Sequence, residues 1–563
     1  MALIPDGCLV VLVSALLAQA QATTSMPVAP RDTPALAKGT AAIKGKVVAA
    51  AGGRALRRVQ ISLSSPDLGE AKSVSTNAEG LFEFTELPAG RYTLTASRAG
   101  YLRTSYGQRR PGEAGRPIEL ADGQRFVNAN FSLARTGAIV GRVTDEVGDP
   151  MPNASLYPMQ WRYFRGQRRL VPVPGGGMFN RTDDTGQYRI TGLEPGDYMV
   201  MAVTRESWTD EKNPKERIGF LPTYAGGTAS PADAMPVKVG LGQEVVMPEF
   251  PMVPGRVGSI SGTVVSQAGL PLAGETVNSS QEFAGPGTSS SFGAGSAKIA
   301  PDGTFTIRNV PPGEYKLSLR LAGDAERPSE GASTVVSVAG EDLSGVLLVT
   351  TPGGTLRGRV VTDTGEALPR DHKMRVSSRA VDPARTYTEY DQDNGRVRDD
   401  LTFELKGVFG ANRLSISPLP TGWSLRSIEH EGIDLVDVPV DLSDGHQLNG
   451  IVVLLSKSMP KLRGTLLDDA GAPTEGTVIL FPEDQGRWSE GSRLIRSTRP
   501  DASSAFEFRN VVPGEYLIAP VPYVRENDWS DPSFLEGLRD GAKRVRVEDS
   551  GAQPVALVLK REQ

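Results

Sequence analysis

The sequence of 563 residues has one cysteine, Cys8, and only three histidines, His372, His430 and His446. Cys8 lies within a segment that we expect to be removed from the mature chain, so disulfides, thiolate metal sites and cysteine nucleophiles are excluded together. The spacings of the three histidines match no metal-ligand motif. We therefore expect solvent-exposed loop histidines, and we predict neither a metal site nor a cofactor.

The chain also lacks an excess of charge of either sign. Lysine and arginine together number 61 and aspartate and glutamate 66, which gives a net charge of −5. Nucleic-acid-binding proteins normally present a basic surface, so DNA or RNA is not an expected partner. Glycine (63) and proline (42) are abundant while apolar runs persist, a combination typical of a turn-rich all-β protein.

Only one long apolar run occurs, from Leu9 to Leu17, and it is too short to span a bilayer. Two small-x-small patterns follow it, Ala18-Gln-Ala20 and Ala20-Gln-Ala22, and together they predict a secretory signal peptide over residues 1–22. The residues before the run include no lysine or arginine, which is atypical, and a buried apolar segment is the alternative. We expect a mature protein without an integral membrane segment, exported to the periplasm or to the cell surface.

A strand signature of the form apolar-x-Gly-x-apolar recurs along the chain. Its five copies are Ile43-Lys-Gly45-Lys-Val47, Ile139-Val-Gly141-Arg-Val143, Ile260-Ser-Gly262-Thr-Val264, Leu356-Arg-Gly358-Arg-Val360 and Leu462-Arg-Gly464-Thr-Leu466. The copies start 96, 121, 96 and 106 residues apart, and each interval suits one β-sandwich with loops of variable length. The three motif residues are spaced by two and face the same way, and the glycine leaves room for a neighbouring backbone or side chain.

A second signature, a Phe-x-apolar strand followed by a Pro/Gly turn and a tyrosine strand, predicts the hairpin that closes each sandwich. It is clearest in Phe305-Thr-Ile307 and Val310-Pro-Pro-Gly-Glu-Tyr315, whereas the fourth copy has Val408-Phe-Gly-Ala-Asn412 without tyrosine and has diverged. The predicted segments are a signal peptide (1–22), a flexible segment (23–39) and five β-sandwiches (40–135, 136–256, 257–352, 353–458 and 459–563).

This order of motifs resembles the carboxypeptidase regulatory-like domain, a transthyretin-like and carbohydrate-binding-like fold related to Cna B-type domains. The resemblance is strong in copies one to three, good in the fifth and weak in the fourth. It implies five tandem Greek-key β-sandwiches with an accessory, non-catalytic role. It names no ligand, because this fold is reused for stalks, adhesion and glycan binding.

The same resemblance raises the question of an internal isopeptide bond, which Cna B-type domains can carry with the assistance of a glutamate. Four residues after each tyrosine this chain has Ala96, Ala202, Leu319 or Pro520 instead. We therefore expect no isopeptide staples.

Motifs of nucleophilic, zinc-dependent and nucleotide-binding enzymes are missing in an acceptable context, so we do not expect an enzyme. The stretch Asp391-Gln-Asp393-Asn-Gly395 is similar to a calcium loop, but its glycine comes one position early and no bidentate glutamate follows. A turn is the better interpretation.

Two loop features are candidate ligand-binding surfaces. The first is an insertion dense in aromatic residues and arginines, with Trp161, Tyr163, Phe164, Arg165 and Arg168. Flat aromatic faces can stack on sugar rings, and arginines can bind carboxylate or phosphate groups. The alternative is an alternating strand whose arginines face water.

The second feature pairs Tyr106 in the first copy with Tyr224 in the second, each followed 11 or 12 residues later by a proline and a short strand. Such loops could form a paired site at the same edge of two sandwiches. The alternative is a tyrosine that caps the edge of its own sandwich.

The last copy has an insertion with helix signals, namely Asp531 as N-cap, Pro532 at the first helical position and an apolar stripe. It predicts a short helix packed over the domain, and a partner-binding helix is the alternative. From all these features we expect an exported, bacterial-type binding or adhesion protein, with polysaccharide as the favoured ligand class. A structural spacer or scaffold that docks envelope proteins is the competing hypothesis.

Overall fold

The computed structural model describes residues 39–560 apart from 66–67, 69–70, 165–166, 174–179, 286–287, 324–326, 382–393, 490 and 526–527. The chain divides into two units, Met1–Lys38 and Gly39–Gln563, and the described part belongs to the second. The predicted signal peptide and nearly all of the predicted flexible segment therefore lie outside the described residues. No helix in the described part is long and apolar enough to cross a membrane.

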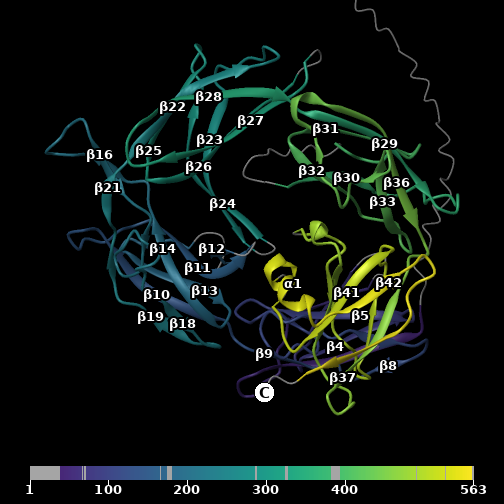
Figure 1. The fold of residues 1–563 in the computed structure, drawn as a ribbon. Coiled ribbons are helices and arrows are strands. Elements are labelled where there is room, and N and C mark those ends of the chain that lie inside the picture. The colour runs from purple at the N-terminus through teal and green to yellow at the C-terminus, as the bar shows by residue number, and fades with distance from the viewer. Residues whose placement is uncertain are drawn as a thin grey trace, which may run out of the picture. The chain divides into compact units, whose positions relative to one another are not determined.

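Almost all regular structure is β-strand, which confirms an all-β fold of tandem sandwiches, numbered one to five here in chain order (Figure 1). Sandwich one contains β1 (Ala41–Ala49), β2 (Gln60–Ser64), β3 (Lys72–Ser75), β4 (Leu81–Leu87), β5 (Gly90–Ser97), β6 (Thr104–Ser105), β7 (Ile118–Leu120), β8 (Arg125–Phe126) and β9 (Phe131–Leu133). Sandwich two contains β10 (Gly137–Thr144), β11 (Ser155–Phe164), β12 (Gln167–Pro172), β13 (Gln187–Leu193), β14 (Gly196–Val203), β15 (Ser207–Thr209), β16 (Arg217–Phe220), β17 (Thr223–Tyr224), β18 (Val237–Val239), β19 (Glu244–Val246), β20 (Phe250–Pro251) and β21 (Pro254–Arg256).

The other three sandwiches follow the same plan with fewer strands. Sandwich three contains β22 (Gly258–Ser266), β23 (Thr276–Gly285), β24 (Thr288–Lys298), β25 (Thr304–Val310), β26 (Gly313–Leu321), β27 (Glu330–Val338) and β28 (Leu343–Pro352). Sandwich four contains β29 (Gly354–Thr362), β30 (Arg375–Ala380), β31 (Thr402–Val408), β32 (Ala411–Ser417), β33 (Ser424–His430), β34 (Ile433–Asp434), β35 (Val440–Asp441) and β36 (Gln447–Ser456), with a 3-10 turn at Ser443–Gly445. Sandwich five contains β37 (Leu462–Asp468), β38 (Thr477–Pro482), β39 (Arg496–Thr498), β40 (Ala505–Phe508), β41 (Gly514–Val521), α1 (Pro532–Arg539), β42 (Lys543–Val547) and β43 (Val555–Leu559), with 3-10 turns at Gln485–Arg487 and Asp528–Ser530.

One pairing scheme is common to all five sandwiches. The first strand pairs antiparallel with the Phe-x-apolar strand, as β1 does with β4, and parallel with a strand near the end of the repeat, as β22 does with β28. The tyrosine strand belongs to the facing sheet, where β5 pairs with β2 and β41 pairs with β38. Five hydrophobic clusters lie between these sheets, and each falls inside one of the five predicted segments.

The motif glycine of each first strand lies against another part of the chain, as its sequence position predicts. A Cβ atom on Gly45, Gly262, Gly358 or Gly464 would lie between 1.9 and 2.2 Å from a backbone carbonyl oxygen of the parallel strand region. In Gly141 the neighbour is the hydroxyl of Tyr188, at 2.6 Å. Any side chain at these positions would separate the two strands.

The tyrosine of the recurring hairpin has the same hydrogen bond in every copy that retains it. The hydroxyls of Tyr92, Tyr198, Tyr315 and Tyr516 each donate to the carbonyl four residues earlier, over 2.6 to 2.8 Å. Their rings are almost fully buried in the cores. Burial raises the pKa of Tyr516 to about 12. The hairpin motif is thus a structural element of each sandwich.

Sandwich four replaces this tyrosine by Asn412. The side-chain amide of Asn412 is buried and donates to the carbonyls of Phe409 and Gly410, at 2.8 and 3.0 Å. The turn carbonyls are therefore satisfied by a shorter side chain, which explains how the divergent copy keeps its hairpin.

A residue in the left-handed backbone region lies near the end of each Phe-x-apolar strand, next to last in the first four copies and two residues past the strand in the fifth. These residues are Glu86, Gly192, Asn309, Gly407 and Asn510, with φ between 54° and 75°. The register between the first strand and the Phe-x-apolar strand shifts beside this position in sandwiches one to four. Glycine and asparagine tolerate this conformation, whereas glutamate does not favour it.

The short helix predicted in the last copy is present as α1. The Asp531 carboxylate accepts a hydrogen bond from the Ser533 amide, and Pro532 is the first helical residue. Leu535 is fully buried against the outer face of the sheet that contains β38 and β41, in one cluster with Phe481 and Leu517. The apolar stripe of the helix is thus covered by its own domain, beside β41 in Figure 1.

The left-handed conformation of Glu86 predicts a stabilising substitution. Glu86→Gly should raise the unfolding free energy of sandwich one by up to about 1 kcal/mol, because glycine relieves the strain of the left-handed region. Glu83→Gly, in the same strand but outside the left-handed region, is the control and should lower stability. Hydrogen exchange of the β4 amides in the full chain measures the stability of both variants. An equal loss of stability in Glu86→Gly and Glu83→Gly would contradict this interpretation.

The conserved geometry of the tyrosine hairpin gives a second prediction. Tyr315→Phe should destabilise sandwich three by about 1 kcal/mol, because the Pro311 carbonyl loses its donor. Tyr106→Phe is the matched control, since no described residue accepts a hydrogen bond from the Tyr106 hydroxyl. Hydrogen exchange in β26 and β5 would report the stability of the two variants. A loss of stability in Tyr106→Phe as large as that in Tyr315→Phe would refute the predicted role of the tyrosine hydrogen bond.

Candidate functional site

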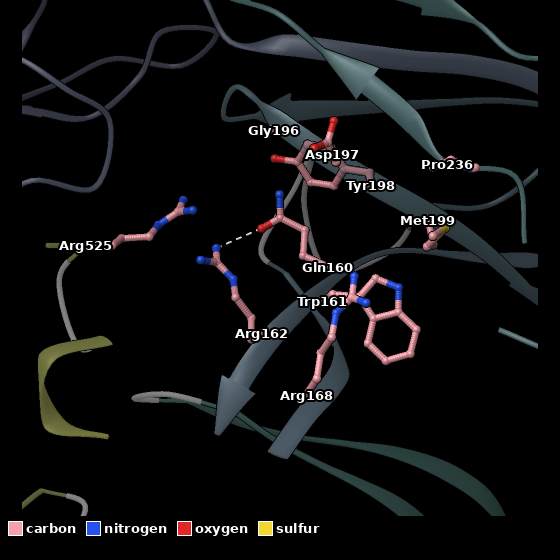
Figure 2. Close-up of a pocket in the computed structure, with 10 residues that line it drawn as sticks. All are labelled: Gln160, Trp161, Arg162, Arg168, Gly196, Asp197, Tyr198, Met199, Pro236 and Arg525. Atoms are coloured by element: carbon pink, nitrogen blue, oxygen red, sulfur yellow. Dashed lines mark hydrogen bonds between the residues drawn. The ribbon is translucent and has the colours of Figure 1, made fainter. Parts of the chain in front are cut away.

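A pocket of about 280 Å³ lies where the β11–β12 hairpin of sandwich two meets sandwich five (Figure 2). The hairpin is a regular antiparallel pair in which Trp161 lies opposite Leu170 and Arg162 opposite Arg169. The pocket is lined by Gln160, Trp161, Arg162, Arg168, Gly196, Asp197, Tyr198, Met199, Pro236 and Arg525. The lining therefore contains three arginines and one carboxylate.

Trp161 and Arg168 form one wall of the pocket. The guanidinium of Arg168 lies over the indole ring of Trp161, 4.8 Å from its centroid, as Figure 2 shows. Arg168 is exposed, and no carboxylate pairs with it within the described part of the chain. An exposed cation held on an aromatic face can pair with an anionic group without first breaking an ion pair.

Arg162 and Arg525 form the opposite wall and come from different sandwiches. Arg162 donates to the Gln160 side chain at 2.8 Å and lies 3.9 Å from the Asp528 carboxylate. Arg525 pairs with Glu194. Burial lowers the pKa of Arg162, and the neighbouring charge of Arg525 lowers it further. A bound anion would reduce this repulsion between two guanidinium groups.

The tyrosine hairpin of sandwich two supplies the floor of the pocket. Gly196, Asp197 and Tyr198 follow the turn at which Glu194 pairs with Arg525. Burial raises the pKa of Tyr198 to about 12, and Glu194 adds to the effect. Tyr198 is therefore a neutral hydroxyl at physiological pH, already engaged with the Glu194 carbonyl.

The structure brings together two of the five residues predicted in the aromatic and arginine-rich insertion, Trp161 and Arg168. Tyr163 and Phe164 belong to strand β11, but their side chains are outside the described part of the structure. Arg165 lies outside the described residues altogether. Sequence reasoning overlooked Arg162 as a site residue, although it lies in the same insertion, and it could not find Arg525, which is over 350 residues further along.

Tyr106 lies in sandwich one, apart from the residues of this pocket. Its ring makes edge contacts with Phe126 and Phe131, with centroids 5.9 and 6.1 Å apart. Burial raises the pKa of its hydroxyl. This packing agrees with the alternative in which the tyrosine caps the edge of its own sandwich.

Tyr224 is 9% exposed and packs with Met159, Met201 and Ala234 on the outer face of a sheet in sandwich two. Burial raises its pKa as well. So little surface remains that Tyr224 has no place in the pocket. The two loops are nevertheless equivalent, since β6 and β17 both pair with the end of the tyrosine strand, as do β7 and β18 with its start.

The histidines do not gather at a site. His446 is exposed, as expected, but both ring nitrogens of His372 are buried and have no hydrogen-bond partner among the described residues, contrary to the expectation of an exposed loop. Asp391 and Asp393 lie outside the described residues. Within the described part no group of three or more histidine, cysteine, aspartate or glutamate residues could hold a metal ion.

Residues 42–134 match the family model of the carboxypeptidase regulatory-like domain. The match covers sandwich one and confirms the resemblance there. No curated protein matches the sequence.

Solved structures with a similar fold include pilins. The minor pilin GBS52 of Streptococcus agalactiae is 16% identical with a TM-score of 0.22, over 38% of this chain and 97% of its own. The shaft pilin SpaA of Lactobacillus rhamnosus GG is 12% identical with a TM-score of 0.19, over 38% and 96%. The Bacillus anthracis TIE protein is 11% identical with a TM-score of 0.14, over 76% and 74%. Similarities at this level carry no information on function.

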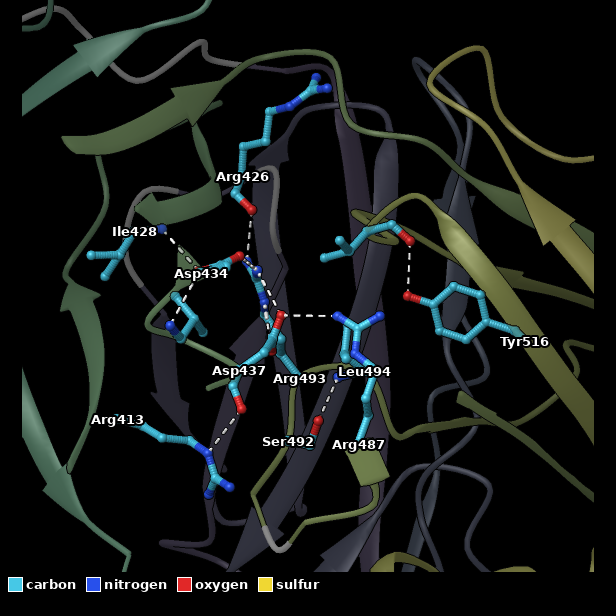
Figure 3. A network of polar contacts seen from close by, with 12 residues as sticks. Arg413, Arg426, Ile428, Asp434, Asp437, Arg487, Ser492, Arg493, Leu494 and Tyr516 are labelled. Carbon is cyan, nitrogen blue, oxygen red and sulfur yellow. Dashed lines mark hydrogen bonds and ion pairs between the residues drawn. The ribbon is translucent and has the colours of Figure 1, made fainter. Parts of the chain in front are cut away.

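A second polar cluster joins sandwiches four and five (Figure 3). Arg493 donates to both carboxylate oxygens of Asp437, at 3.2 and 3.1 Å, to Asp434 and to the carbonyl of Arg426. Burial raises the pKa of Asp434, although Arg493 opposes this. Because the acceptors of this cluster are paired within the protein, we interpret it as a structural joint between the two sandwiches.

The joint predicts a large difference between two arginine substitutions. Arg493→Ala leaves the Asp437 carboxylate, 5% exposed, without its bidentate partner and should loosen the joint by on the order of 3 kcal/mol. Arg426→Ala removes only an exposed ion pair with Asp549 and should cost less than about 1 kcal/mol. Tryptic cleavage at Lys457 and Lys461, between the two sandwiches, should accelerate in Arg493→Ala alone; equal cleavage rates would rule out the joint.

Proposed function

We propose that this protein is an exported, non-enzymatic binding protein of five sandwiches whose pocket on sandwich two binds an acidic polysaccharide. The observation that carries the proposal is the pocket lining, which has three arginines (Arg162, Arg168 and Arg525) and one aspartate (Asp197) beside the indole of Trp161. Arg162 and Arg525 also have carboxylates nearby, Asp528 and Glu194, whereas Arg168 has none among the described residues. Guanidinium groups bind carboxylates through paired hydrogen bonds, and an indole stacks on the apolar face of a sugar ring.

In polymers rich in uronic acids, each acidic sugar unit has both a carboxylate and a sugar ring with an apolar face. A carboxylate at a sugar ring could meet Arg162 and Arg525 while the ring itself lies near Trp161. The predicted signal peptide supports a location where such polymers occur, and the expected absence of catalytic motifs supports binding without turnover. Tyr163, Phe164 and Arg165, which the sequence predicts as ligand-binding residues, remain part of the proposal. Tyr106 and Tyr224 do not, because they are engaged in packing.

The alternative function is a structural spacer or a scaffold that docks envelope proteins. One observation favours it: the contacts of the half-buried Arg493 join two sandwiches to one another. Such contacts fix the spacing of the sandwiches, as a spacer requires. Cross-linking in the native envelope would distinguish the alternatives, because a stoichiometric protein partner in the absence of glycan would favour the scaffold.

Binding to immobilised polygalacturonate tests the proposal directly. The full chain should bind polygalacturonate but not its methyl ester or dextran, because esterification removes the charge and leaves the sugar rings. Arg168→Ala and Trp161→Ala should each weaken binding about tenfold, the effect of losing one charged or stacking contact.

Arg189→Ala is the matched control. Arg189 is exposed in the same sandwich but on the sheet without the pocket, where it pairs with Glu244. It should bind like the parent chain. Equal binding of the ester and the acid, or unchanged binding by Trp161→Ala and Arg168→Ala, would eliminate this pocket as the site.

A further inference from the structure

Two residues between β41 and α1, Tyr523 and Arg525, connect sandwich five to two other sandwiches at once. The Tyr523 hydroxyl donates to the Pro111 carbonyl of sandwich one at 3.1 Å, and the Arg110 guanidinium lies 5.1 Å from the centre of its ring. Two residues later, Arg525 pairs with Glu194 of sandwich two. A Cβ atom on Gly112 would lie 2.8 Å from the Arg525 side chain, so the backbone of sandwich one also touches this arginine.

A buried arginine forms a second contact between sandwiches five and one. Arg499 is 3% exposed and donates to the carbonyls of Gly107 and Ala114, at 3.0 and 3.1 Å. Its guanidinium also lies 3.5 Å from the Glu113 carboxylate, which is itself buried. These partners belong to a loop that is nearly 400 residues away in sequence.

The surroundings of Arg499 complete a polar interface. Glu475 of sandwich five accepts hydrogen bonds from Arg109, at 2.9 Å, and from Arg116 of sandwich one. Arg91 of sandwich one likewise donates to sandwich five, to the Thr498 hydroxyl at 3.3 Å. The donors and acceptors of the two surfaces match, so the loop around Tyr106 that resembled a ligand-binding loop is a docking surface for sandwich five.

We propose that sandwich five docks onto sandwich one of the same chain through Arg499 and Tyr523, and that this docking delivers Arg525 to the pocket of sandwich two. The binding pocket is then complete only when sandwich five is docked onto sandwich one. Because the polar groups of the two surfaces match, we take the chain's own fifth sandwich as the partner of this loop. The experiment below also detects the other arrangement, in which the fifth sandwich of a second copy binds there. The link to an acidic ligand rests on the proposed function, whereas the docking itself does not.

The docking can be measured without any ligand. The only cysteine, Cys8, is replaced by serine, and spin labels are placed at Ala78→Cys in sandwich one and Ala470→Cys in sandwich five, both at exposed turns. Electron–electron double resonance on the full chain should give one narrow distance distribution. Arg499→Ala should broaden it and shift it to longer distances, because Glu113 and two carbonyls lose their partner.

Two further variants make this experiment decisive. Arg463→Ala, which removes an exposed arginine paired with Glu507 inside sandwich five, should leave the distribution narrow. Tyr523→Ala should broaden it even if Arg499→Ala proves unstable, because it removes the second contact independently. A broad distribution in the parent chain, or a narrow one in both interface variants, would overturn the proposal. So would a distance signal that disappears on dilution with unlabelled chain, because the docking would then be between copies.

Polygalacturonate binding by the same proteins tests the link to the pocket. Arg525→Ala should weaken binding about tenfold while the distance distribution stays narrow, since the Arg499 and Tyr523 contacts are both still present. Arg499→Ala should weaken binding although it lies outside the pocket. Unchanged binding in Arg499→Ala would refute the link. If the parent chain binds no acidic polymer but its distance is narrow and depends on Arg499, the proposed function fails and the docking stands.

Discussion

Four of the five sandwiches depend on a close approach between the motif glycine of the first strand and a backbone carbonyl of the parallel strand region. At Gly262 the carbonyl oxygen of Val346 occupies the space where a Cβ atom would be, 1.9 Å from its ideal position. The parallel strand has an extra residue there, since Ile260 pairs with Leu343 but Gly262 pairs with Val346. The bulge and the glycine therefore belong together, because a bulge that pushes a carbonyl inward needs a partner without a side chain.

The approach of these strands fixes the position of the other elements. The first strand holds the Phe-x-apolar strand on its other edge, and the hairpin after that strand crosses to the facing sheet. There the tyrosine hydroxyl ties the turn to its own backbone, so the crossing has one geometry in four copies. Sandwich four shows what the geometry requires, because Asn412 supplies a donor to the same turn with a much smaller side chain.

Much of this architecture could be predicted from sequence because it depends on local patterns. The glycine motif, the Phe-x-apolar strands, the Pro/Gly turns and the capped helix α1 are each determined within about ten residues. The left-handed residues were not predicted, because Glu86 gives no sign of a bulge that asparagine or glycine would suggest. Trp161 and Arg168 could be named from the sequence because they lie on one hairpin, whereas Arg525 reaches the same pocket from another sandwich. Tyr106 and Tyr224 lie in loops that pair in the same way with their tyrosine strands, but the packing that covers their rings cannot be read from composition.

The arginines at the junctions illustrate how such contacts arise in a chain with little net charge. Arg493 and Arg499 each bind backbone carbonyls as well as carboxylates, which a planar group with five donors can do and an ammonium group cannot do as well. Junctions of this kind need few apolar residues, so the surfaces of the separate sandwiches remain polar.

The connections between sandwiches are short: Ala134–Thr136, Val257, Gly353 and Lys457–Lys461. The two single-residue connections are themselves hydrogen-bonded, since Val257 donates to the Arg217 carbonyl and Gly353 to the Ser329 carbonyl. For a flexible chain, bringing together residues nearly 400 positions apart would cost about 5 kcal/mol of loop-closure entropy. Here only four short connections can vary, so most of that entropy is already lost when the sandwiches fold. The lengths of these connections consequently determine where sandwich five lies relative to sandwich one. One inserted residue would shift the fifth sandwich by about 3.3 Å, the rise of one strand residue.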